Sequence, residues 1–133
     1  MAVVPLVSDQ QASGKVAEIY ADIRATRGTD FINNFWRALA CDPDLLERTW
    51  NEIKSVMSAS GNLDPLVKEM IYIGVSAANG CSYCVHSHTA SARAKGMSDA
   101  MHAELLSVIA LAGKTNQLAE SLQVPTDPEF QID

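Results

Sequence analysis

Two cysteines and a histidine have a spacing that is typical of thiol chemistry. Cys81 and Cys84 stand three residues apart, and His88 follows four residues later. On an α-helix the two thiols would lie about 60° apart around the axis, with the His88 imidazole between them. Cys81 would fall in the first turn, where unpaired N–H groups and the helix dipole favour a thiolate. An imidazole on the same face can accept a thiol proton, so the pattern predicts a redox-active dithiol with His88 as its base.

A carboxylate enters by a separate argument, from the register of two helices. Glu69 stands eleven residues before Gly80 and His88 stands eight residues after it. If the helices on either side of this turn pack antiparallel, the two side chains differ by about 4 Å along the axis. A carboxylate in a largely apolar helix is rarely buried without a partner. We therefore expect Glu69 to pair with His88, orient its imidazole and stabilise its protonated form.

The elements that must position these residues are helices. Apolar residues recur at helical spacing, Asp-Pro pairs and glycines mark the ends, and no convincing alternating stretch indicates a strand. We expect an all-α fold of six or seven packed helices in one domain over residues 1–133. The dithiol would lie at a helix N-terminus within a helical hairpin. The expected helices are 13–28, 31–39, 43–61, 65–78, 81–95, 98–111 with Gly113 as a stop, and a shorter one at 115–122.

Composition limits the classes of function. The chain has 133 residues, of which 47% are hydrophobic and 20% charged, and its net charge is −6. A negative chain without clustered Lys and Arg argues against nucleic acid as a partner. No apolar run approaches the roughly 20 residues of a membrane span, and the first residues do not resemble a secretory signal. We expect a cytoplasmic protein with reduced thiols, no membrane partner and no cofactor.

The spacing also resembles a known family signature. The chain is similar to the signature of the AhpD-like alkylhydroperoxidases, in the carboxymuconolactone decarboxylase superfamily. The matching pattern is Glu69, eleven residues, Cys81, two residues, Cys84, three residues and His88. Residues 83–90 and 95–97 resemble it too, and the similarity is best over residues 64–112. One departure is Tyr83, because AhpD proper has a histidine there. The lost histidine is a proton carrier or hydrogen-bonding group.

The resemblance implies a fold, an activity and partners. An AhpD-like protein reduces a small hydroperoxide through a dithiol that closes to a disulfide. The resemblance implies that Cys84 attacks the peroxide, that Cys81 resolves the sulfenate, and that His88 and Glu69 relay protons. It further implies re-reduction by a lipoyl or thioredoxin-like dithiol protein, and a homo-oligomer that is a trimer or hexamer. The residues alone do not choose the attacking cysteine, since the helix start favours Cys81 as the more acidic thiol.

Other readings of the same residues stay open at this point. Cys81, Cys84 and His88, with Glu69 as a possible fourth ligand, are also a plausible tetrahedral zinc set. A third hypothesis is an oligomeric assembly protein that keeps its dithiol without catalysis. Of the remaining histidines, His86 is expected to lie on the surface or at an interface and His102 is expected to be structural. Cys41 is expected to be a small buried hydrophobe.

Overall fold

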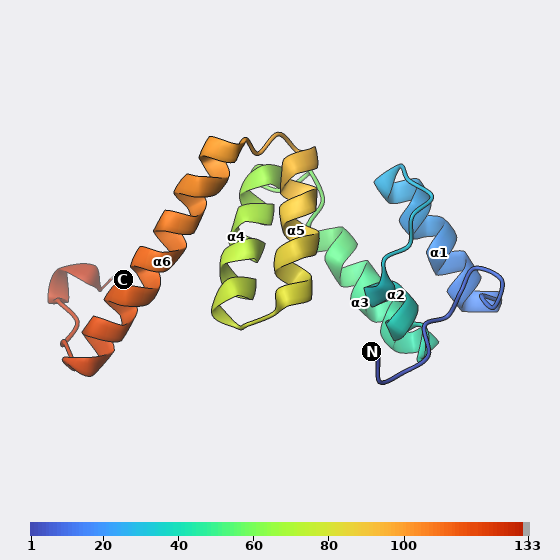
Figure 1. Ribbon diagram of the computed structural model, residues 1–133, viewed down its shortest axis with the longest axis horizontal. Helices are drawn as coiled ribbons and strands as arrows, with labels where there is room; N and C mark the ends of the chain where they lie inside the picture. The colour runs from blue at the N-terminus through green and yellow to red at the C-terminus, as the bar shows by residue number, and fades with distance from the viewer. Residues whose placement is uncertain (132–133) are drawn as a thin grey trace. The chain divides into compact units, whose positions relative to one another are not determined.

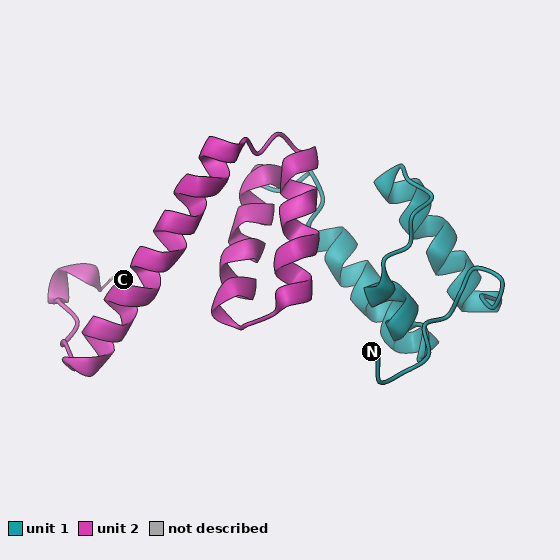
Figure 2. Cartoon of the chain, in the orientation of Figure 1, with its two compact units in different colours: residues 1–61 teal, residues 62–133 magenta. Residues whose placement is uncertain are grey.

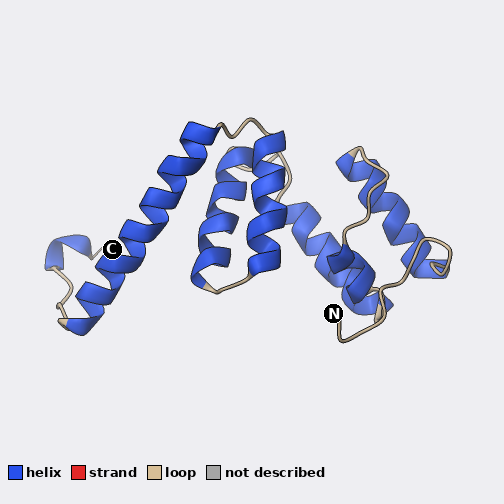
Figure 3. Cartoon of the chain, in the orientation of Figure 1, coloured by secondary structure: helices blue, strands red, loops and turns tan. Residues whose placement is uncertain are grey.

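The computed structural model describes residues 1–131, and within them every regular element is a helix (Figures 1 and 3). This confirms the all-α fold class. A short 3₁₀ turn, Pro128–Phe130, follows the last helix. The six α-helices are α1 (Gly14–Arg27), α2 (Asn34–Leu39), α3 (Pro43–Val56), α4 (Pro65–Ala78), α5 (Ser82–Ala94) and α6 (Asp99–Ser121).

The chain forms two compact units, Met1–Gly61 and Asn62–Asp133 (Figure 2). Helices α1 to α3 belong to the first unit and α4 to α6 to the second. The expectation of a single domain over residues 1–133 stays a prediction, and residues 132 and 133 lie outside the described part of the chain.

The first unit is organised around an aromatic and aliphatic core. The indole rings of Trp36 and Trp50 meet edge to face with centroids 5.4 Å apart. Trp50 is buried, and its Nε1–H donates a hydrogen bond to the Asp22 carboxylate at 2.7 Å, so the one polar atom of its side chain has a partner. The buried residues of this core are Val16, Ile19, Tyr20, Ile23, Ile32, Trp36, Ala40, Leu46 and Trp50.

The second unit is built on an antiparallel hairpin of α4 and α5 (Figure 1). The side chain of Asp64 caps α4 by accepting from the Leu66 N–H at 2.8 Å, and Pro65 occupies the first turn. Gly80 then adopts a φ of +70°, a backbone conformation that favours glycine and reverses the chain. Ile73 of α4, Ala92 of α5 and Met97 form the buried core of this unit, and the partly buried residues packed against them are Leu66, Met70, Leu105 and Ile109.

Three helix boundaries differ from the expected ones by three residues or more. One is the start of α2, at Asn34 instead of Phe31. Gly113 does not end a helix: α6 runs through it without a break, so a separate helix at 115–122 is wrong. A glycine inside a helix costs about 1 kcal/mol relative to alanine, and the good helix formers on both sides outweigh that cost. Helix α3 ends at Val56 instead of near Gly61, where Ser58 and Ser60 pair their hydroxyls at 2.8 Å. Residues 58–61 are Ser, Ala, Ser and Gly, and serine and glycine are unfavourable in a helix interior.

The long helix α6 is unusual in burying none of its residues. Several large apolar side chains on it are at least half exposed: Leu106, Val108, Leu111 and Leu118. Helix α4 carries a second exposed apolar stripe at Val67, Ile71 and Val75. Among residues 1–131, no helix combines the length and apolar character needed to cross a membrane.

Candidate active site

The hairpin brings the predicted carboxylate and imidazole together. Glu69 comes from α4 and His88 from α5, and the His88 Nδ1 lies 2.7 Å from the Glu69 Oε2. The side chain of Glu69 is only 6% exposed and that of His88 is 22% exposed. The pairing expected from the helix register is therefore confirmed. Which reaction the pair serves is a separate question, and the catalytic roles of these residues stay predictions.

Glu69 has two further partners that the sequence reasoning missed. Its Oε1 accepts from the Ser91 hydroxyl and from the Lys95 ammonium group, each at 3.1 Å. Lys95 also donates to the Ser91 hydroxyl at 3.1 Å. His88, Ser91 and Lys95 are spaced at three, four and seven residues along α5 and therefore share one face of the helix. That spacing is the signal that could have found them.

The hydrogen bond to Glu69 selects one tautomer of His88. An ionised carboxylate only accepts, so the Nδ1 of His88 carries the proton and Nε2 keeps the free lone pair. The Tyr72 ring stacks on the imidazole with centroids 3.7 Å apart and planes inclined by 19°. Since the ring is held in its plane by Tyr72 and at one edge by Glu69, its basic nitrogen has a defined direction.

Charge at the buried carboxylate is balanced by its donors. Burial of Glu69 opposes ionisation, but the hydrogen bonds from His88 and Lys95 outweigh it and hold the pKa of the carboxyl below its usual 4.5. Glu69 is therefore an anion at neutral pH, although its side chain is almost fully covered.

The two thiols are reduced and differ in their surroundings. Cys81 is the N-cap of α5, one position outside the first turn where we expected it, and its Sγ accepts from the Cys84 N–H at 3.3 Å. Hydrogen bonds from the Cys84 thiol and backbone lower the pKa of Cys81. The interaction with Cys81 raises the pKa of Cys84, against the effect of a hydrogen bond from the Ser76 hydroxyl. In the reduced pair, Cys81 is thus the more acidic thiol, as its place at the helix start indicates.

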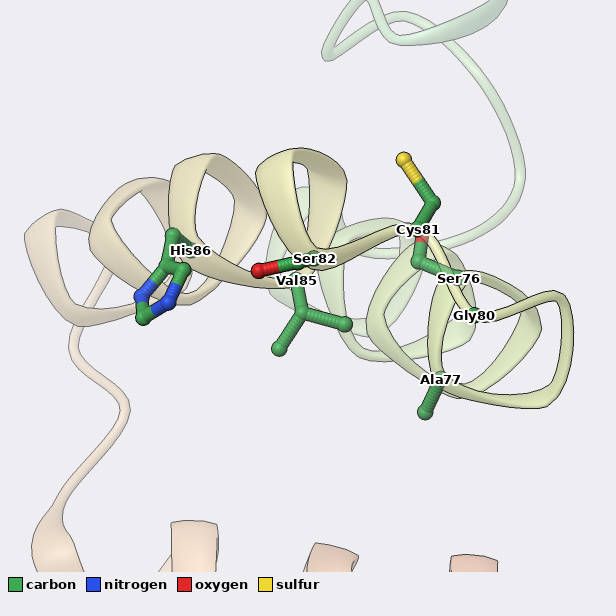
Figure 4. Close-up of a pocket in the computed structure, with 7 residues that line it drawn as sticks. All are labelled: Ser76, Ala77, Gly80, Cys81, Ser82, Val85 and His86. Carbon is green, nitrogen blue, oxygen red and sulfur yellow. The ribbon is translucent and has the colours of Figure 1, made fainter.

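An open pocket of about 230 Å³ lies beside the dithiol, on the side where α4 turns into α5 (Figure 4). Cys81 stands at its edge, with its Sγ pointing away from Val85 and Ala77. The pocket combines apolar and hydroxyl groups with an exposed imidazole. It is lined by Ser76, Ala77, Gly80, Cys81, Ser82, Val85 and His86.

The residues outside this cluster also have defined places. His102 contacts the Arg93 guanidinium at 3.3 Å, which is consistent with the structural role expected for it. Cys41 is exposed, so the expectation of a buried side chain is wrong. The reason is that α2 ends at Leu39 and Cys41 lies in the turn before α3, outside either apolar stripe. In the described part of the chain, no three His, Cys, Asp or Glu side chains are grouped as a metal site requires.

Comparison with known proteins decides the family. The family model for the carboxymuconolactone decarboxylase family matches residues 43–127, which is more than half of the chain. The chain belongs to the carboxymuconolactone decarboxylase family. Within it the chain is AhpD-like. The crystal structure of an alkylhydroperoxidase AhpD core from Rhodospirillum rubrum is 56% identical, with a TM-score of 0.97 over 100% of this chain and 99% of that one.

More distant relatives include two alkyl hydroperoxide reductases and a dehalogenase. An alkyl hydroperoxide reductase AhpD from Solibacter usitatus is 40% identical over 49% of this chain. An alkyl hydroperoxide reductase from Mycobacterium tuberculosis is 30% identical over 83% of it, and an (R)-2-haloacid dehalogenase from Pseudomonas putida is 27% identical over 80%. The matched segments span 35%, 31% and 35% of the three relatives, so this chain corresponds to about a third of each.

Proposed function

We propose that the chain is a thiol-dependent hydroperoxide reductase that cycles through a Cys81–Cys84 disulfide. The observation that carries the proposal is the close approach of the imidazole of His88 to buried Glu69, one helical turn beyond Cys84. A dithiol at a helix start, with an oriented base on the same helix face, has what nucleophilic thiol chemistry requires. The names of the AhpD-like relatives support the same class of reaction.

In the proposed first step, Cys84 attacks the hydroperoxide. Its proton passes to the Nε2 of His88, and the thiolate attacks the terminal oxygen of the substrate. The O–O bond breaks and an S–O bond forms. The leaving alkoxide takes the proton from the His88 imidazolium and departs as an alcohol. Cys84 is left as a sulfenic acid, oxidised by two electrons. Glu69 stabilises the imidazolium while it carries the proton.

In the second step, Cys81 closes the disulfide. Its thiolate attacks the sulfur of the Cys84 sulfenic acid, an S–S bond forms, and hydroxide leaves as water after taking up a proton. The hydrogen bond from the Cys84 backbone N–H, one of the causes that lower the pKa of Cys81, suits this role because it does not depend on the Cys84 thiol. A dithiol protein of the lipoyl or thioredoxin-like class would then reduce the disulfide by two thiol exchanges and itself become a disulfide.

The experiment that tests the function is a time course of thiol oxidation in the reduced, metal-free protein mixed with an organic hydroperoxide. Exposed Cys41 serves as an internal reference for a thiol without a base partner. We expect Cys81 and Cys84 to be lost together, at least about a hundredfold faster than Cys41, since positioned acid–base catalysis contributes that much. Peptide mapping should place the new disulfide between them.

Two single variants assign the cysteines. Cys81→Ser should still oxidise once at the rapid rate and give a sulfenic acid on Cys84 that a dimedone-type reagent captures. Cys84→Ser should react no faster than Cys41. The reverse pattern would exchange the two roles. Oxidation of both thiols at the rate of Cys41 would remove the peroxidase function, and stoichiometric zinc in the purified protein would favour the metal-binding reading.

We also propose that the chain works as a homo-oligomer. Helix α6 buries none of its residues, yet exposes Leu106, Val108 and Leu111. Exposed apolar faces of this extent are typical of protein interfaces. Light scattering should give a trimer or hexamer, as the resemblance implies. Leu111→Glu should shift the mass towards the monomer. Glu120→Asp, which keeps an existing negative charge at an exposed position of the same helix, should leave the mass unchanged.

A further inference from the structure

The second half of helix α6 is exposed on all sides. The helix crosses α4 at Gly74, where Ile109 lies 3.8 Å from the position that a Cβ would take. Leu105 and Ile109 are the residues of α6 that pack against the core of this unit. Every residue from position 110 to position 131 is exposed. We call residues 110–131 the arm, which consists of the last turns of α6 and the tail after them (Figure 1).

An arm of this kind needs a surface to pack on. A helix of about twelve residues is only marginally stable alone in water, because helices in proteins are stabilised mainly by the packing of an apolar face. The arm has such a face, since Leu111, Leu118 and Leu122 are spaced by seven and four residues and lie on one side of the helix. These side chains are 60%, 50% and 71% exposed. The described part of the chain therefore leaves this apolar face open.

The chain also exposes more surface than compact folding leaves. Its accessible surface is 9341 Å². Two separate compact units with a total mass of 14.3 kDa would expose about 8,000 Å². The excess is more than the roughly 800 Å² that each partner buries in a stable protein complex. The area available is thus enough for an interface with another protein molecule.

A related crystal structure has the arm on the same course. The AhpD core from Rhodospirillum rubrum superposes with a TM-score of 0.97 over 100% of this chain. An arm folded back onto its own chain in that crystal structure would lower the score well below this value. The two proteins, 56% identical, therefore share the extended arm. The partner that any such chain has at hand is another copy of itself.

Helix α4 carries a second apolar face without cover in the described residues. Val67, Ile71 and Val75, the α4 stripe, stand four residues apart and are 41%, 52% and 56% exposed. Residues spaced in this way form a ridge that packs into a groove on another helix. The buried residues Glu69 and Ile73 lie on the opposite side of α4, so a helix seated on the stripe would leave the contacts between α4 and α5 in place.

We propose that the arm of one copy packs on the α4 stripe of a second copy, so that the copies are joined by exchange of their arms. This deepens the homo-oligomer proposed above and rests on it, because it names the two surfaces that meet. A second copy fits better than a different protein, since each copy gives an arm and receives one, and a closed assembly then covers both apolar faces. Two arms paired with each other would leave the α4 stripe exposed.

The first test is photo-crosslinking in the full chain. A benzophenone amino acid replaces Leu118 or, as a second probe, Leu111. The control probe replaces Gln117, which is exposed on the same arm but lies about 100° around the helix from Leu118. After irradiation, a denaturing gel with reductant separates covalent dimers, and mass spectrometry locates the crosslink. We expect dimers from both leucine positions, with the crosslink within residues 65–78 of the second copy, and little or none from position 117.

The second test uses added charges and light scattering. Leu118→Glu on the arm and Ile71→Glu on the α4 stripe should each weaken association of the copies at least about tenfold, because each places a carboxylate in an apolar contact. Gln117→Glu adds the same charge to the arm outside its apolar face and should leave association unchanged. Circular dichroism checks that each variant is folded.

Crosslinks from position 118 to α6 of the second copy would overturn the proposal in favour of paired arms. If light scattering gives an oligomer but neither leucine probe yields dimers crosslinked to α4, the arm exchange fails and the homo-oligomer stands. Unchanged association in folded Ile71→Glu would also overturn the exchange. A monomer in light scattering would remove both the exchange and the homo-oligomer. The time course of thiol oxidation decides the hydroperoxide reductase separately from all of these outcomes.

Discussion

The substitution Glu69→Gln tests the polar network most directly. Glutamine has nearly the same shape, but one of its two terminal atoms donates instead of accepting. If its oxygen keeps the bonds from Ser91 and Lys95, its NH₂ group faces the Nδ1–H of His88. Either two donors then oppose each other, or His88 moves its proton to Nε2 and loses the basic lone pair on that atom.

The cost can be worked from the contacts. A hydrogen bond to a charged group contributes about 1.5–3 kcal/mol, and the His88–Glu69 bond is short and mostly covered. The Lys95 bond is more exposed and contributes less. We therefore expect Glu69→Gln to lower the free energy of unfolding by about 2 kcal/mol at about pH 7, measured by urea denaturation. Glu104→Gln, at an exposed carboxylate of α6, is the control.

The effect of Glu69→Gln on the free energy of unfolding should also depend on pH, in a direction set by the pKa of Glu69. The pKa of Glu69 is lower in the folded chain than its usual 4.5, so the folded state binds fewer protons than the unfolded state in this range. Its stabilisation is complete above the usual value and is lost as the pH falls through the lower folded value. The gap in unfolding free energy between the unchanged protein and Glu69→Gln should begin to close as the pH falls below 4.5 and should go on closing at lower pH. A gap that is absent at about pH 7, or that does not narrow as the pH falls below 4.5, would refute the reasoning.

Three further substitutions test single contacts. Ser76→Ala removes the hydroxyl whose hydrogen bond lowers the pKa of Cys84, so the pKa of Cys84 should rise. At constant pH, alkylation of Cys84 should slow about threefold for each half unit by which its pKa rises. Trp50→Phe removes the hydrogen bond from the indole N–H to Asp22, whereas Trp36→Phe removes an indole N–H that has no hydrogen-bond partner. In urea denaturation, Trp50→Phe should therefore be less stable than Trp36→Phe by about 1 kcal/mol. Gly113 lies within α6, with open space where a Cβ would stand. Gly113→Ala should raise the free energy of unfolding by about 0.5–1 kcal/mol and so raise the thermal midpoint.

The sequence predicts the helices well wherever capping chemistry is local. Asp42 and Asp64, each followed by proline, cap α3 and α4 as expected, because an N-cap depends on neighbouring atoms only. The boundary near Gly113 is not predictable in the same way. There, a glycine that ends helices elsewhere is tolerated in a long helix, and the balance is set by the summed propensity of residues on both sides.

In the candidate site, too, some contacts could be predicted from local spacing and others could not. Glu69 beside His88 follows from counting residues on both sides of a short turn, since antiparallel helices with a tight connection have little freedom of register. Lys95 was missed because a lysine near a helix end usually serves the helix dipole and solvent. Its contact with a buried carboxylate depends on how a long side chain bends back over one turn, which spacing permits but does not require.

The place of Cys81 just outside α5 has a consequence for the entropy of the unfolded chain. Cys81 is the N-cap and Cys84 lies three residues on, within the first turn. A bond between their sulfurs would close so small a loop that the unfolded chain would lose few conformations, unlike a cross-link between distant segments. For a loop of four residues the chain-entropy relation gives about 2 kcal/mol, against about 4.7 kcal/mol for a loop of 100 residues. Oxidation should therefore raise the melting temperature by less than half as much as a cross-link between distant segments would. The hairpin could gain and lose two electrons with a smaller change in folding free energy than a long-range structural cross-link imposes.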